Sequence, residues 1–148
     1  MTGRGDTDLA LAAVRRVRAA RERDSRLGLA HALAERDRRA QAVQEAGDRL
    51  AAAAPFTGGS SGDFLTAVAA GSWLAQDLAE TRVRAERAGV LAAEAGHRWQ
   101  QDRRAIRVVE LLLERHAEQR RAERVRAEAR ELDDIAGQGW LRTRGGAS

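Results

Sequence analysis

The chain has 148 residues, and 85 of them are Ala, Arg, Leu or Glu, the composition of long helices and coiled coils. Leu, Ile, Val and Phe together number 28, which is too few large apolar residues for a sandwich, a barrel or a layered sheet. The 26 cations, all arginine, nearly balance 22 anions, so the high net charge typical of disorder is missing. Without cysteine there is no disulfide framework and no thiolate site.

One stretch breaks the helical pattern, Pro55 to Gly62, which holds the single proline, three glycines and two serines. We therefore predict an all-α fold, an antiparallel two-helix coiled-coil hairpin with a longer second helix. The expected single unit, 1–148, has helix 1 at about 8–53, a loop at 54–62, helix 2 at about 63–137 and a disordered tail at 138–148. Ser61 or Asp63 is expected to cap the second helix.

Apolar residues spaced by three and four predict the seams of both helices. In helix 1 the seam is expected at Ala10, Ala13, Val17, Ala20, Asp24 and Leu27, and, after a shift near Gly28, at Leu29, Leu33, Arg36, Ala40, Val43, Gly47 and Leu50. In helix 2 one seam is expected at Ile106, Val109, Leu113 and His116, and another at Ala122, Val125, Ala129, Leu132 and Ala136.

Counting outward from a loop centre at residue 58 predicts the pairing register. Val17 is then expected opposite Trp99, so that Trp99, Ile106, Val109 and Leu113 pack near Leu11 to Val17. Helix 1 would end opposite about residue 108, and the last ~30 residues of helix 2 would project as an overhang roughly 40 Å long.

Signatures of catalysis and of metal binding are missing from the sequence. The glycine run lacks the lysine of a phosphate-binding loop, and His31, His97 and His116 have no second histidine at ligand spacing. We therefore expect no enzyme, no cofactor and no metal. No apolar run reaches the ~18 residues of a membrane span, which favours a soluble, cytoplasmic protein.

Two features of the sequence are candidates for binding, the arginine clusters and the tryptophans. The arginine clusters could meet phosphates, but interleaved acids and the lack of an aromatic platform favour a solvated coiled-coil surface. Trp73 and Trp99 lie on the second helix, where a two-helix coil half buries an indole, so each is either a core anchor or a partner contact.

The C-terminal half carries a recognisable pattern: Trp99, Ile106, the stretch VVELLLER from Val108 to Arg115, and ELDDIAG from Glu131 to Gly137. This pattern resembles the FliJ family, the small coiled-coil component of the flagellar type III export apparatus. The layout of a shorter first helix, a Gly/Ser loop and a longer second helix is similar as well. Asp134 stands where the family usually has glutamate, and alanine replaces most of its mid-helix aromatic residues.

The resemblance implies a rod-like stalk and chaperone component without enzymatic activity. Its implied partners are the hexameric export ATPase, the cytoplasmic domain of the export gate and export chaperones, with no specific nucleic acid. It implies a cytoplasmic location, peripherally associated with the inner face of the cell membrane through the export apparatus.

The overhang and the loop end supply the candidate contact residues. For the ATPase ring these are Arg115, Arg120, Arg121, Arg124, Arg126, Arg130, Leu132, Asp133 and Asp134. For the export gate they are Trp73, Leu74 and Leu78. Two alternatives stay open: the equivalent stalk of a virulence-type secretion system, and a basic coiled-coil adaptor for nucleic acid or another helical partner.

Overall fold

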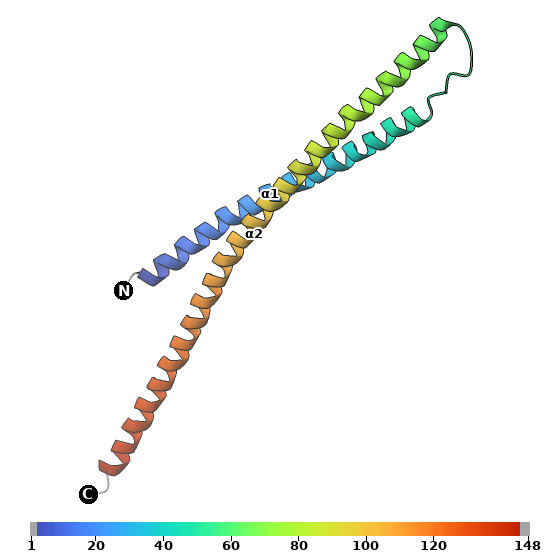
Figure 1. The fold of residues 1–148 in the computed structure, drawn as a ribbon. Coiled ribbons are helices and arrows are strands. Elements are labelled where there is room, and N and C mark those ends of the chain that lie inside the picture. Colours follow the sequence, from blue (N-terminus) through green and yellow to red (C-terminus); the bar gives the residue numbers. More distant parts are fainter. Residues whose placement is uncertain (1–2, 146–148) are drawn as a thin grey trace. The chain divides into compact units, whose positions relative to one another are not determined.

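The computed structural model describes residues 3–145, which form two helices (Figure 1). Helix α1 spans Gly3–Ala51, and helix α2 spans Ser61–Gly145. The predicted all-helical fold with a longer second helix is confirmed, since α1 has 49 residues and α2 has 85. Both helices run past the expected bounds, and α2 continues through residues 138–145, which were expected to be disordered.

The chain divides into two compact units, each built from one stretch of α1 and one of α2. Unit 1 contains residues up to Arg18 together with those from Ala105 onward, and unit 2 is Ala19–Arg104. Within each unit the two helical stretches pack antiparallel, as predicted. That the whole chain forms a single coiled-coil unit stays a prediction.

In unit 2 the α2 side of the seam follows an unbroken spacing of three and four residues. Its members are at least half-buried, and four of them are alanine: Leu74, Leu78, Thr81, Ala85, Ala88, Ala92, Ala95 and Trp99. On α1, Ala46 is buried against this seam. Small side chains allow two helix backbones to approach closely, so an alanine-rich stripe serves as a core here despite its low hydrophobicity.

The seam of α1 lies on a more polar stripe than the predicted one. Asp8, Leu11 and Arg18 in unit 1, and Glu22 and Ser25 in unit 2, are half-buried. The residues assigned to the first seam are exposed instead: Ala10, Ala13, Val17, Ala20, Asp24 and Leu27. The prediction was wrong because it followed apolar side chains, whereas Asp8 and Glu22 reach the seam through polar contacts with α2. The later part was mostly right, since Leu29, Leu33, Val43, Gly47 and Leu50 are half-buried while Arg36 and Ala40 are exposed.

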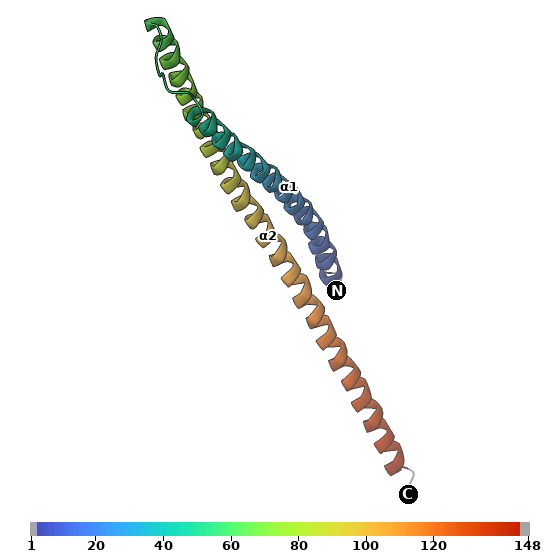
Figure 2. The same cartoon turned by 90° about the vertical axis from the view of Figure 1, so that its right-hand side faces the viewer.

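The pairing register of unit 2 is fixed by two polar contacts. Trp99 Nε1 donates a hydrogen bond to Glu22 Oε1 at 2.8 Å, and Arg49 forms an ion pair with Asp77 at 2.9 Å. Glu22, not the predicted Val17, is therefore the partner of Trp99. The symmetric count failed because α2 begins beyond the end of α1, and the loop at 52–60 continues past the end of α1 to reach it (Figures 1 and 2).

In unit 1 the start of α1 pairs with residues of α2 up to Arg120. Asp8 contacts both His116 and Arg120, and Arg15 lies 3.6 Å from Glu110. Val109 is 7% exposed and belongs to this seam, as predicted. The overhang of α2 consequently begins at about residue 121, not at 109.

Local sequence explains where α2 begins. Ser60 is its N-cap: the Ser60 backbone N–H donates to Asp63 Oδ2 at 2.8 Å, and the Asp63 N–H donates to Ser60 Oγ at 3.2 Å. This reciprocal capping box replaces the predicted cap at Ser61 or Asp63. Gly59 precedes it with φ 143°, and a Cβ there would meet Asp63 Oδ2 at 2.8 Å, so only glycine fits.

Candidate partner-binding surfaces

The C-terminal overhang, residues 121–140 of unit 1, extends beyond the paired part of α2, and near its start Glu123 lines a small pocket together with Gly5 and Asp8 of α1. Every side chain in it is exposed, and Val125 and Leu132 are 63% and 67% accessible. Seven residues predicted to contact the ATPase ring lie on this segment: Arg121, Arg124, Arg126, Arg130, Leu132, Asp133 and Asp134. The segment carries four arginines interleaved with five acids and four large apolar side chains. Its guanidinium groups suit contact with carboxylates.

The other two predicted ring residues lie in the paired part of unit 1. Arg115 is exposed on α2. Arg120 donates from Nη1 to Asp8 Oδ2, while His116 Nδ1 lies 2.8 Å from Asp8 Oδ1. Arg120 thus holds the first turns of α1 against α2, in addition to being partly accessible.

The search for functional residues in the sequence missed Asp8. It follows Thr7 near the N-terminus, and the predicted seam there followed apolar residues only. Its spacing of three residues from Leu11 is the signal that places it on the seam of α1. At that position its two carboxylate oxygens contact His116 and Arg120 of α2.

The loop end of unit 2, which we call the apolar tip, exposes large hydrophobic side chains. Its members are Phe56, Phe64, Leu65, Val68 and Trp73. The Phe56 and Phe64 rings pack edge to face at 5.4 Å. From Ala51 to Gln76 the single charged residue is Asp63. Aromatic and aliphatic surface with so little charge is typical of a protein-contact site.

The three residues predicted to contact the export gate differ in accessibility. Trp73 is 68% exposed, and Leu74 is half-buried. Leu78 is 8% exposed and packs in the seam, so it stabilises the helix pair and offers no surface to a partner. Trp73 is therefore the accessible member of the three.

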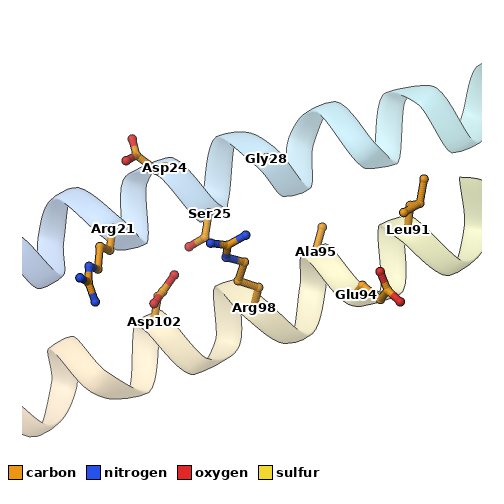
Figure 3. Close-up of a pocket in the computed structure, with 9 residues that line it drawn as sticks. All are labelled: Arg21, Asp24, Ser25, Gly28, Leu91, Glu94, Ala95, Arg98 and Asp102. Carbon is orange, nitrogen blue, oxygen red and sulfur yellow. The ribbon is translucent and has the colours of Figure 1, made fainter.

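A groove of about 960 Å³ lies between the helices of unit 2 (Figure 3). Ser25 and Gly28 on α1 and Ala95 on α2 leave this space because their side chains are small. Arg98 and Asp102 extend from α2 toward α1, whereas Asp24 points away from α2. The groove is open and carries charges of both signs, so it favours no single kind of small ligand.

Trp99 lies beside this groove and makes two polar contacts. Besides its hydrogen bond to Glu22, its ring lies 5.2 Å from the Arg103 guanidinium carbon. The indole is thereby oriented by one anion and one cation. This tryptophan is a core anchor, whereas Trp73 is exposed.

No group of three metal-ligating side chains occurs in the described part of the chain. No helix among the residues that the structure describes is long and apolar enough to cross a membrane.

Comparison with known families gives one match. Residues 7–145 match the family described as "Flagellar FliJ protein", which covers both helices and the loop. No curated protein and no solved structure matches the chain.

Proposed function

This chain belongs to the FliJ family of non-enzymatic stalk components of the flagellar export apparatus, and we propose that its overhang engages the hexameric export ATPase. The exposure of residues 121–140 is the observation that carries this proposal. A helix that lacks its own coiled-coil partner is available to a surrounding ring. The flagellar family match also favours this role over the virulence-type stalk and over a nucleic-acid adaptor.

Weak individual contacts suit such an engagement. An exposed ion pair between an arginine and a carboxylate contributes about 0–1 kcal/mol. The free energy of binding to the ring would therefore be the sum of several such pairs. Arg121, Arg124, Arg126 and Arg130 offer four guanidinium groups within three helical turns. A sum of weak contacts also permits the rod to rotate or rock.

For the export gate we propose contact through Trp73 and its neighbours on the apolar tip. The tip lies in unit 2 and offers aromatic surface with one charge, which fits an apolar pocket on a partner. Export chaperones are further candidate partners. Association with these components would place the protein peripherally at the inner face of the cell membrane.

A charge-neutralisation experiment tests the ring contact. The four substitutions Arg121→Gln, Arg124→Gln, Arg126→Gln and Arg130→Gln keep helix propensity and remove the cations. The matched control replaces four exposed arginines outside the overhang: Arg16, Arg26, Arg82 and Arg87. We expect the first variant to lose capture of the purified export ATPase and the control to retain it. Equal capture by both variants would contradict the proposal.

A further inference from the structure

Helix α2 carries a second heptad face in unit 1, separate from the seam that packs on α1. Residues on this face recur at spacings of three and four: Val108, Leu111, Arg115, Glu118, Ala122 and Val125. Four of the six are apolar, and a shallow groove is lined by Val108, Leu111, Arg115 and Glu118. A sustained heptad pattern is the signature of a coiled-coil contact.

This second face is unoccupied by α1. Val108 is 57% exposed and Leu111 is 48% exposed, whereas the adjacent Val109 is 7% exposed. Each residue turns an α-helix by about 100°, so Val108 points about 100° away from Val109 and Leu111 points about 160° away from it. The pattern therefore predicts another helix that packs there.

We propose that this face, residues 107–128 of α2, binds the same face of a second copy of this chain in antiparallel orientation. In one register of this antiparallel pair, every core residue of one copy lies opposite a compatible core residue of the second copy. Val108 meets Val125 of the second copy, and Leu111 meets the small Ala122 of the second copy. At the centre, Arg115 meets Glu118 of the second copy, so each polar core residue finds an opposite charge.

The flanking charges select the same register. Arg107 faces Glu128 of the second copy, and Glu114 faces Arg121 of the second copy. Two-fold symmetry repeats each pair, which gives four interchain ion pairs beside the core. Arg107 also lies 3.3 Å from Glu114 within its own chain, so the pairs form one charge network.

Other arrangements bring like charges together. A parallel pair would place Arg115 against Arg115 of the second copy, and Arg121 against Arg126 of the second copy. An antiparallel pair shifted by one heptad in one direction places Arg121 against itself, and in the other direction Glu114 against itself. Like charges at flanking positions disfavour these alternatives.

Self-association through this face would cover Arg115 and Arg121, two residues assigned above to the ATPase ring. A dimer and a ring-engaged stalk would then be mutually exclusive states. The inference does not rest on the ring contact, because self-association is measured on the purified chain without the ATPase.

Sedimentation equilibrium of the full chain over a concentration series is the first test. We expect a monomer–dimer equilibrium with a Kd on the order of 10 µM, because three short core layers with their symmetric repeats bury less area than a standard interface. A chain that stays monomeric well above that concentration would overturn the inference.

Charge reversal tests the register. Glu114→Arg alone and Arg121→Glu alone each create two like-charge pairs, and we expect at least about tenfold weaker dimerisation. Mixing the two single variants should restore dimers as heterodimers, and the double variant Glu114→Arg with Arg121→Glu should dimerise with itself. Single variants that dimerise like the original chain, or a mixture no tighter than its components, would contradict the register. Circular dichroism checks that each variant remains helical.

Disulfide trapping tests the orientation, since the chain has no cysteine of its own. Leu111→Cys mixed with Ala122→Cys should give interchain disulfides under mild oxidation. Leu111→Cys alone should not, because in the antiparallel register its two copies lie roughly 16 Å apart along the helix axis. Efficient linking of Leu111→Cys with itself would identify a parallel pair and overturn the inference.

Discussion

The indole N–H of Trp99 is bonded to the carboxylate of Glu22 at 2.8 Å, which joins α2 to α1 inside unit 2. Both residues are half-buried, so the bond is partly shielded from water. Glu22 lies on the seam of α1 because of this contact.

We predict that Trp99→Phe lowers the free energy of unfolding by about 1–2 kcal/mol, because it removes a hydrogen bond to a half-buried carboxylate. Thermal or denaturant unfolding followed by circular dichroism measures the change. Trp73→Phe is the matched control and should stay within about 0.5 kcal/mol, since Trp73 is exposed. Equal effects at the two positions would argue against the Glu22 bond as a register-setting contact.

Asp8 is predicted to hold the first turns of α1 on α2 in unit 1. Asp8→Ala removes the contacts with His116 and Arg120. Amide hydrogen exchange in residues 5–14 should accelerate by roughly fivefold, as expected for local opening when about 1 kcal/mol of pairing is lost. Asp6→Ala is the control, because Asp6 is exposed in the same turn. Unchanged exchange in the Asp8 variant would show that apolar packing alone holds this end.

The capping box at Ser60 predicts a pH dependence of the α2 N-terminus. Two hydrogen bonds from the Ser60 backbone N–H and hydroxyl hold the pKa of Asp63 below its usual value. The capping contribution is therefore complete above the unfolded-state pKa of about 3.9 and is lost as the pH falls through the lower folded pKa. Amide chemical shifts of residues 61–64 followed down to about pH 2 measure it. Asp63→Asn should remove the transition, and a transition that persists would assign it to another group.

Glycine substitutions should have opposite effects at two positions. Gly59→Ala should destabilise the loop, because φ is 143° and the new Cβ would contact Asp63 Oδ2. Gly28→Ala should stabilise the chain by about 0.5–1 kcal/mol, because Gly28 is inside α1 with open space around it. Thermal unfolding of both variants checks the signs. Stabilisation by Gly59→Ala would contradict the described turn.

The fold class could be predicted from the sequence because its determinants are local. The proline and the clustered glycines at 55–62 disfavour a continuous helix, and the arms on either side contain no other proline. The Ile106, Val109 and Leu113 seam was found as well, because its side chains are large and apolar.

The register and the first seam of α1 could not be predicted in the same way. The pairing register depends on how far α2 begins beyond the end of α1, and loop composition does not encode that distance. Asp8 and Glu22 belong to the seam through partners more than 70 residues away in the sequence. A search for regularly spaced apolar residues therefore does not find them. For the binding surfaces, the sequence indicated the charged residues of the overhang, but only the structure separates exposed Trp73 from buried Leu78.

Stimulation of the export ATPase by a truncated chain tests the central claim most directly. A truncation after Arg120 removes the overhang and retains Asp8, His116 and Arg120, so the helix pairing of both units is preserved. Few packing contacts are lost, and circular dichroism should show a folded helical protein. We predict that this chain no longer stimulates the ATPase, whereas the full chain does. Full stimulation by the truncated chain would show that the overhang is not the engaging element.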